Sequence, residues 1–300
     1  MSGMEEAKTV EFHRPYIDAI TLNCPECGKK MTRVPEVLDC WFDSGAMPFA
    51  QHHYPFENKD WFEDHFPSDF IVEYTGQIRC WFYYLHVLSV ALFEKPAYKN
   101  CVVHGTILAK DGKKLSKSSK NYTDPMELMK RYGTDAFRLY LYRSNAIIMN
   151  DLLFDEKGVK EQIQQVLLPL YNCASFFNSY AILDKFEPDG IKLPSSNNEL
   201  DKWILAKLYK TEKEITENMN NYQIDKYVEP IVNLIDGFSS WYLRRSRRRF
   251  WESEFTNDKK NAYETTYYVL INICKLLAPV APIISEYLYK NLTGEESVHL

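Results

Sequence analysis

Residues 69–94 have the sequence DFIVEYTGQIRCWFYYLHVLSVALFE, which contains the clearest structural pattern of the chain. The first part, 69–76, is an apolar run closed by a glycine, and it predicts a buried strand of a parallel sheet. The second part, 77–94, is apolar on nearly every side and predicts a helix that is packed on both faces. A strand, a glycine turn and a helix make one crossover unit, so we expect an open α/β sheet.

A lysine-rich segment, DGKKLSKSSKN at 111–121, follows the next predicted strand, CVVHGTILA at 101–109. We call residues 111–121 the lysine loop. Most charge runs are solvated loops, which is the ordinary interpretation here. In open α/β sheets, however, ligands bind outside the carboxyl ends of the strands, and this loop follows such an end. Its position favours a clamp for polyphosphate.

The second half of the chain has helical patterns. Asp124 and Pro125 start a helix as its N-cap and first helical residue, and helical periodicity continues from about residue 156. A polar connector at 185–198 carries proline, glycine, serine and asparagine turn residues. The expected architecture is half of a parallel α/β sheet in 35–155, after a small segment 1–34, and an all-α helical bundle in 156–300.

The segment WYLRRSRRRFW at 241–251 has the densest positive charge of the chain. On a helix, Leu243 and Phe250 lie on one side, and the five arginines lie on the opposite side together with Trp241. Such a face suits a phosphate backbone and one stacked base. The alternative is that the arginines pair with the acidic residues that are frequent in this chain.

A compact cysteine motif, CPECG, lies at 24–28. Two thiolates two residues apart, with a glycine that allows a tight turn, form half of a tetrahedral zinc site. No second pair of this kind follows, so Cys24 and Cys27 need two ligands from elsewhere. The alternative is a pair of free thiols.

The segment 35–68 is rich in aromatic residues, proline and histidine and is too irregular for one helix. Within it, WFDSG at 41–45 is interpreted either as a turn that lines a pocket or as a packed loop. The residue types alone favour the packed loop.

The composition limits the class of protein. A hydrophobic fraction of 45% allows a substantial core, and a net charge of −5 excludes a uniformly basic nucleic-acid binder. We see no apolar run of about 20 residues, so we expect no membrane span. Seven scattered cysteines fit reduced thiols in the cytoplasm better than a disulfide framework.

The lysine loop also carries a family signature. KLSKS at 114–118 resembles the KMSKS motif of class I aminoacyl-tRNA synthetases, with leucine in place of methionine. PEVLDCWFDSGAMPFAQ, FPSDFIVEYTGQIRCWFYYLHVLS, the pentapeptide, the DAFRLYL segment and the arginine segment occur in the family's order. Together they resemble the isoleucyl-tRNA synthetases over essentially the whole chain, and WFDSG differs from the valyl and leucyl forms.

The resemblance implies a Rossmann-type sheet and a two-step reaction. ATP with magnesium and isoleucine would give isoleucyl-adenylate and pyrophosphate, and the aminoacyl group would pass to tRNA-Ile. It also assigns roles to residues of this sequence. The phosphates would be held by Lys114 and Lys117 with hydrogen bonds from Ser116 and Ser118; the adenylate would contact Glu73, Gln77, His104 and Gly105; the amino-acid pocket would contain Trp41, Asp43 and Trp81; tRNA would contact Trp241, Arg244, Arg245 and Arg248.

The sequence also departs from the family. Gly76 stands where much of the family has an acidic residue, and Cys80 where it has glycine. No H-x-G-H motif occurs, and neither the first half of the nucleotide-binding fold nor an editing insertion is found. We therefore expect a fragment that is inactive alone and needs a missing N-terminal half. The alternatives are a tRNA-binding module without catalysis and a valyl or leucyl enzyme of the same class.

Overall fold

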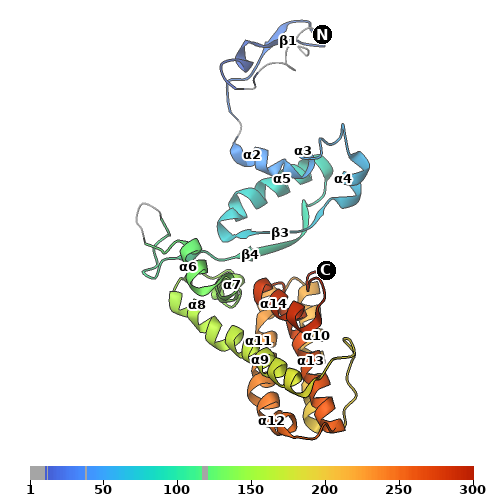
Figure 1. Ribbon diagram of the computed structural model, residues 1–300. Helices are drawn as coiled ribbons and strands as arrows, with labels where there is room; N and C mark the ends of the chain where they lie inside the picture. Colours follow the sequence, from blue (N-terminus) through green and yellow to red (C-terminus); the bar gives the residue numbers. More distant parts are fainter. Residues whose placement is uncertain (1–10, 12, 38, 117–120) are drawn as a thin grey trace. The chain divides into compact units, whose positions relative to one another are not determined.

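The structure is a computed structural model, and it describes residues 11, 13–37, 39–116 and 121–300. The chain divides into two compact units (Figure 1). One, the N-terminal unit, contains the residues up to Ser68 and the segment Gly76–Ala97. The other, the bundle unit, contains Asp69–Thr75 and Tyr98–Leu300.

The N-terminal unit begins with a small hairpin. A short 3-10 helix, η1 (Ile17–Ala19), precedes β1 (Thr21–Asn23), which pairs antiparallel with β2 (Lys30–Thr32). The turn between the strands contains Gly28 at a φ of +72°, which is a backbone conformation that glycine adopts without strain. The cysteine motif therefore occupies the tip of a hairpin.

Short helices make up the rest of this unit: α2 (Cys40–Gly45), α3 (Met47–Ala50), α4 (Lys59–His65) and α5 (Trp81–Phe93), with η2 (Thr75–Arg79) before α5. The interpretation of WFDSG as a turn or loop is wrong, because the segment is the helix α2. Asp39 accepts a hydrogen bond from the backbone N–H of Trp41 at 2.7 Å and so caps this helix.

Helix α5 packs on one side only. Phe82, Leu85 and Ser89 are buried, whereas Tyr83 and Leu92 are exposed. Helix α2 covers the buried side so closely that a Cβ on its Gly45 would lie 2.8 Å from the Cβ of Tyr84. The prediction of a helix packed on both faces is wrong here, because α2 and the aromatic rings around Phe93, among them Phe49 and Phe62, leave the side with Tyr83 and Leu92 exposed.

The bundle unit contains the sheet. Strand β3 (Ser68–Tyr74) pairs with β4 (Tyr98–His104), and β5 (Ile107–Leu108) pairs in parallel with β6 (Leu152–Leu153). Asp69 bonds to Lys99, and the ring of Tyr74 lies 6.5 Å from that of His104. Residue numbers therefore rise together along β3 and β4, so these strands also run parallel.

The predicted strand 101–109 is interrupted at Gly105. The N–H of Gly105 donates to the carbonyl oxygen of Ala146 at 2.7 Å, and a Cβ at Gly105 would lie 1.8 Å from the carbonyl oxygen of Asn150. The loop that ends at Asn150 thus crosses the strand at its only residue without a side chain. This long-range contact could not be predicted from local periodicity.

Two helices and a short turn connect the sheet to the bundle: α6 (Pro125–Tyr132), α7 (Thr134–Tyr142) and η3 (Asn145–Ile148). The predicted helix start is confirmed, because Asp124 accepts from the N–H of Met126 at 2.7 Å and Pro125 is the first helical residue. Gly133 ends α6 at a φ of +87°.

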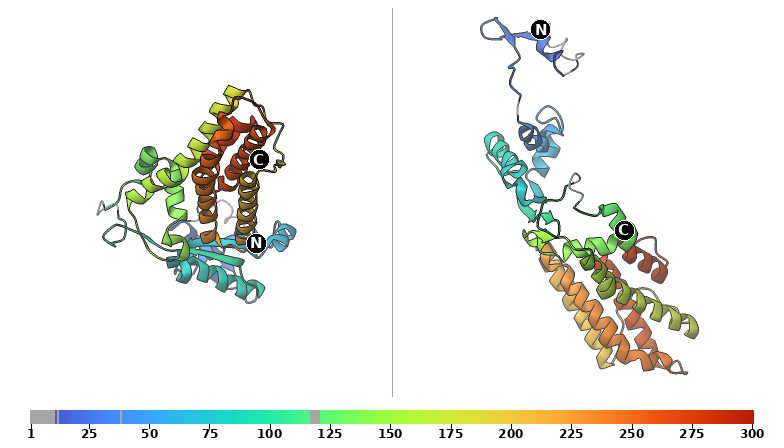
Figure 2. Two further views of the ribbon diagram at one scale, coloured as in Figure 1. Left: turned by 90° about the horizontal axis from the view of Figure 1, so that it is seen from below. Right: turned by 90° about the vertical axis from the view of Figure 1, so that its left-hand side faces the viewer.

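The predicted bundle is confirmed and forms the C-terminal half of the chain (Figures 1 and 2). Its first rod is continuous through a π-turn: α8 (Glu156–Gln162), η4 (Ile163–Leu167) and α9 (Leu168–Asp184). The other elements are α10 (Glu199–Asn220), η5 (Ile224–Lys226), α11 (Val228–Asp236), the π-turn η6 (Gly237–Leu243), α12 (Arg244–Trp251), α13 (Asn257–Leu277) and α14 (Pro282–Thr293).

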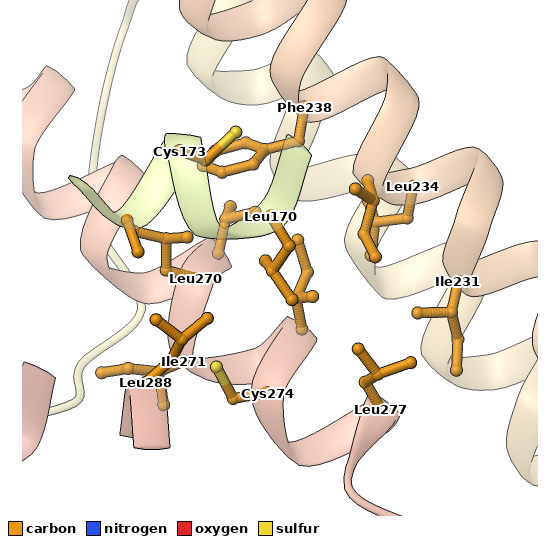
Figure 3. Packing of buried hydrophobic residues seen from close by; sticks show 14 of the residues in the cluster. Leu170, Cys173, Ile231, Leu234, Phe238, Leu270, Ile271, Cys274, Leu277 and Leu288 are labelled. Carbon is orange, nitrogen blue, oxygen red and sulfur yellow. The ribbon is translucent and has the colours of Figure 1, made fainter. Parts of the chain in front are cut away.

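One hydrophobic core holds the bundle together (Figure 3). Leu170 of α9, Leu234 of α11 and Leu270 of α13 are fully buried in it. The rod Glu156–Asp184 is also the one helix of the described residues that is long and apolar enough to cross a membrane. The core helices of soluble proteins can have the same length and apolar composition, and Leu170 of this helix lies in the hydrophobic core. Length and composition therefore do not decide the matter, and the absence of a membrane span stays a prediction.

Helix α7 fixes the half sheet to the bundle through two side chains one turn apart. Asp135, which is buried, accepts from the N–H groups of Ile283 and Ile284 at the start of α14, at 3.2 and 2.7 Å. Arg138 donates to the carbonyl oxygens of Pro279 and Val280, both at 2.8 Å. The carboxylate thus caps a helix start, and the guanidinium binds the carbonyls just before it.

Candidate functional site

The lysine loop begins as a tight hairpin after β5. The N–H of Ala109 donates to the carbonyl oxygen of Lys113 at 2.9 Å, and Leu108 forms an antiparallel bridge with Lys114. Gly112 lies in the turn at a φ of +79°. Lys117 and Ser118, two of the predicted phosphate ligands, lie outside the described residues. Lys114 and Ser116 are described and lie directly after the hairpin.

The lysines that flank this hairpin have carboxylate partners. Lys113 pairs with Asp111 at 3.2 Å, and Lys110 pairs with Asp155 at 3.0 Å. The backbone N–H of Lys113, followed by its side chain, holds the pKa of the Asp111 carboxyl below its usual range. Among the residues that the structure describes, Lys114 has no ion-pair partner. Its exposed charge therefore remains available for a phosphate.

The far end of the lysine loop is anchored to the start of the bundle. Glu156, at the start of α8, accepts from the hydroxyl of Thr123 at 2.6 Å and from Arg131 at 3.0 Å. A cavity of about 300 Å³ lies beneath the loop. It is lined by Ala109, Lys110, Leu115, Asn121, Tyr122, Thr123, Phe154, Asp155 and Glu156.

The parallel strands bring the residues predicted for the adenosine side to one edge of the sheet. Glu73 is half-buried next to Tyr74, whose N–H donates to its carboxylate at 2.9 Å. A ring nitrogen of His104 lies 2.8 Å from the carbonyl oxygen of Gly105. His104 also lines a mostly apolar cavity of about 270 Å³, together with Val72, Val102, Ile107, Leu141, Tyr142, Ala146, Ile147 and Ile224.

The residues predicted for the amino-acid pocket lie in the N-terminal unit. Trp41 and Asp43 are on α2, and Trp81 starts α5. The indole N–H of Trp81 donates to the carbonyl oxygen of Ser44 at 3.1 Å, so the two helices that carry these residues are joined. The side chain of Gln77, predicted to contact the adenylate, accepts from the N–H of Trp81 at 3.2 Å.

The arginine segment presents an exposed face. The four residues predicted to contact tRNA, Trp241, Arg244, Arg245 and Arg248, are all exposed. The guanidinium of Arg245 lies 4.1 Å from the centre of the Trp241 ring, which is a cation–π contact. The predicted buried side, Leu243 and Phe250, is observed.

One arginine does not lie on this face. Arg249 is buried and donates two hydrogen bonds to the carboxylate of Asp201, at 2.6 and 2.8 Å. Tyr242 donates to the same carboxylate at 2.8 Å, and burial raises the pKa of its phenol. The expectation that all five arginines lie opposite the apolar side is therefore wrong. Tyr242 and Arg249 are seven residues apart and therefore lie on the same side of a helix, and this spacing could have indicated from the sequence that Arg249 faces the core.

The cysteine pair lies in a tight turn at the tip of the β1–β2 hairpin. The N–H of Gly28 donates to the carbonyl oxygen of Cys24 at 2.9 Å. The backbone N–H of Cys27, followed by that of Glu26, holds the pKa of the Cys24 thiol below its usual range. This arrangement stabilises a thiolate, which is the form that binds zinc. In the described part of the chain, however, no group of three or more His, Cys, Asp or Glu could hold a metal ion.

Comparisons with known proteins place the chain in a family. The family "tRNA synthetases class I (I, L, M and V)" matches residues 2–155, and "Anticodon-binding domain of tRNA ligase" matches residues 201–300. The isoleucine–tRNA ligase of Treponema denticola is 46% identical over 97% of this chain, and that of Chlamydia trachomatis is 47% identical over all of it. The chain spans 28% and 29% of the length of these two relatives.

Solved structures share the fold. A LeuRS from Agrobacterium radiobacter K84, solved with tRNA and LeuAMS, superposes with a TM-score of 0.68 at 20% identity; 93% of this chain and 34% of that chain are covered. The methionyl-tRNA synthetase of Mycobacterium tuberculosis, solved with methionyl-adenylate, gives 0.67 at 21% identity and covers 90% and 52%. The half sheet and bundle, with a family match over half of its residues, show that this chain belongs to the class I tRNA synthetases.

Proposed function

We propose that this chain is part of an isoleucine–tRNA ligase, and that it supplies the C-terminal part of the catalytic domain and much of the anticodon-binding domain. The observation that carries the proposal is an identity of 46–47% to isoleucine–tRNA ligases over at least 97% of the chain. In the whole protein, ATP and isoleucine would form isoleucyl-adenylate, and the aminoacyl group would then pass to tRNA-Ile.

The lysine loop serves the first step. A carboxylate oxygen of isoleucine attacks the α-phosphorus of ATP, and the bond from that phosphorus to the pyrophosphate oxygen breaks. Negative charge gathers on the leaving pyrophosphate, so fixed cationic and hydroxyl groups lower the barrier. Lys114 and Lys117 hold this charge, with hydrogen bonds from Ser116 and Ser118. Mg²⁺, when bound to ATP, neutralises further phosphate charge.

The strand ends serve the adenosine side. The cavity beside His104 is apolar and large enough for a flat ring. Glu73 and the backbone at Gly105 offer polar groups near it, and Gln77 lies just after Glu73 in the chain. In the N-terminal unit, Trp41, Asp43 and Trp81 supply the amino-acid pocket.

The exposed arginine face serves tRNA. Arg244 and Arg248 are exposed and can contact phosphates, Arg245 lies over one face of the Trp241 ring, and the other face of that ring offers a surface for an unstacked base. This face also supports a second candidate function, tRNA binding without catalysis.

Two further assignments belong to this proposal. Cys24 and Cys27 would supply two of the four ligands of a structural zinc ion, and the remaining ligands would come from elsewhere in the whole protein. The enzyme would work in the cytoplasm, where its thiols stay reduced.

The test is amino-acid-dependent exchange of pyrophosphate into ATP. The purified chain is assayed alone and after addition of the N-terminal half of a homologous isoleucine–tRNA ligase. We expect no exchange by the chain alone, since it has no H-x-G-H motif, and exchange with isoleucine after complementation. Valine, leucine and methionine are the matched controls. Stronger exchange with one of these would identify a different enzyme of the class.

The second candidate is tested by binding alone. The purified chain is titrated with tRNA-Ile and with a tRNA of unrelated anticodon at several salt concentrations. If the chain binds tRNA-Ile but shows no pyrophosphate exchange even after complementation, the result would favour a tRNA-binding module without catalysis. Binding that ignores the anticodon and disappears steeply with salt would reduce the arginine face to non-specific attraction.

A further inference from the structure

Asn121 closes the lysine loop with its side chain. Its carbonyl oxygen accepts from the backbone N–H of Ser116 at 3.0 Å, and its amide nitrogen donates to the carbonyl oxygen of Lys114, also at 3.0 Å. These two backbone groups flank Leu115 and point the same way, as the groups of a strand do toward a neighbouring strand. The amide of Asn121 therefore replaces a strand neighbour for one residue of the loop.

The other side of the same segment is held by the sheet. Leu108 of β5 forms an antiparallel bridge with Lys114, and Ala109 donates to Lys113. The backbone of Lys114 is thus fixed between strand β5 and the side chain of Asn121. The lysine side chain itself is exposed, and its described surroundings give it no ion-pair partner.

This arrangement has a physical consequence for ligand binding. A lysine is a flexible point charge, and holding it at a phosphate costs conformational entropy. A backbone that is already fixed lowers that cost, because only the side chain then has to be ordered on binding. No charge on Asn121 is needed for this effect.

We propose that Asn121 is a positioning residue: its amide clamps the backbone of Lys114 and Ser116 and so presents the Lys114 ammonium to a polyphosphate. The inference rests on the proposed function of the lysine loop. It adds that the residue just beyond the motif sets the loop's affinity for phosphate through two backbone hydrogen bonds.

The experiment compares Asn121→Ala with the unchanged 300-residue chain. Inorganic tripolyphosphate is titrated into each protein by calorimetry at low salt. We expect the variant to bind about tenfold more weakly, because two hydrogen bonds to the backbone are lost. Asn100→Ala is the matched control, since Asn100 donates a comparable bond to the carbonyl oxygen of Asp69, away from the loop. It should bind tripolyphosphate like the unchanged chain.

A double-mutant cycle separates positioning from a general structural role. Lys114→Ala alone should weaken binding, and adding Asn121→Ala should weaken it little further, because Asn121 acts through Lys114. A general loss of structure would instead reduce binding by the same factor in both backgrounds. Hydrogen exchange gives an independent measure, and the Ser116 amide should exchange about tenfold faster in Asn121→Ala.

The outcomes distinguish this inference from the function on which it rests. If the unchanged chain binds tripolyphosphate and Asn121→Ala binds it equally well, the positioning role is wrong while the phosphate loop stands. If the two losses are additive, Asn121 does not act through Lys114 and the inference also fails. If the unchanged chain does not bind tripolyphosphate, the proposed role of the loop fails, and the inference fails with it.

Discussion

The two basic segments of this chain use positive charge in opposite ways. In and beside the lysine loop, Lys113 and the preceding Lys110 pair with carboxylates at the surface, and the backbone of Lys114 is held by Asn121 while its charge stays exposed. In the arginine segment, the helix itself divides the charges. Arg245 lies over Trp241 at the surface, whereas Arg249 is buried against Asp201.

The difference shows that the density of charge in a sequence does not determine its role. On a helix, each position faces a fixed direction, so neighbouring arginines can serve the core and the surface respectively. A loop has no such periodicity, so the direction of its side chains depends on the hydrogen bonds that hold its backbone. Substitutions in the two segments can test this division between buried and exposed charge.

The largest expected effect is on the buried arginine. Arg249→Met should lower the free energy of unfolding by about 3–5 kcal/mol, because it leaves the carboxylate of Asp201 buried without its cation. Arg248→Ala, one position earlier and exposed, should change it by less than about 0.5 kcal/mol. Urea unfolding followed by circular dichroism measures both, and equal effects of the two variants would contradict the division.

A double variant sharpens this test. Asp201→Leu combined with Arg249→Met removes both charges and should recover much of the lost stability, since apolar residues can replace a buried ion pair. The hydroxyl of Tyr242 then loses its acceptor, so recovery should be incomplete. A double variant as unstable as Arg249→Met alone would mean that packing, not the unpaired charge, causes the loss.

The elements that were predictable from the sequence are those that depend on nearby residues. The cap at Asp124, the positions of the strands on either side of α5 and the helical bundle all follow from local spacing. The prediction that the first of these strands is buried is wrong, because Phe70 and Val72 of β3 are exposed. The apolar side of the arginine segment, with Leu243 of η6 and Phe250 of α12, follows in the same way.

The features that were not predictable depend on distant partners. The burial of Arg249 requires Asp201, which lies 48 residues away in the chain. The break at Gly105 requires Asn150, and the exposed side of α5 reflects how little α2 covers. In the candidate site, the family motif indicated Lys114 and Ser116 but gave no reason to single out Asn121, whose role depends on backbone groups five and seven residues earlier.

A smaller effect is expected on the exposed face of the arginine segment. Trp241→Ala should weaken binding of tRNA-Ile by about 1–3 kcal/mol, the usual contribution of one stacked base. Thermal stability should hardly change, because Trp241 is 49% exposed. Fluorescence titration measures the affinity, with Trp251→Ala as the control for an exposed tryptophan at the other end of α12. Equal losses in both variants would argue against a specific stacking surface.

The smallest expected effect is a change in acid sensitivity, at a second ion pair of the bundle whose lysine is buried and whose aspartate is partly buried. Asp184 pairs with the buried ammonium of Lys259 at 2.7 Å and accepts from the hydroxyl of Tyr263. Burial alone would raise the pKa of Asp184, but these two hydrogen bonds outweigh it and hold the pKa below its ordinary value of 3.8. The lowered pKa stabilises the fold above about pH 3.8, and this contribution is lost as the pH falls through the folded-state value.

Asp184→Asn should therefore unfold with a flatter dependence on pH below about 4 than the unchanged chain, in addition to a loss of stability at neutral pH. Asp111→Asn in the lysine loop is the matched control, because the pKa of Asp111 is also lowered but its pair with Lys113 is exposed. Salt screens exposed pairs far more than buried ones. At high salt the part of the Asp111→Asn effect that comes from the exposed pair with Lys113 should vanish, while the effect of Asp184→Asn persists. Loss of both effects would place the two pairs in the same exposed class.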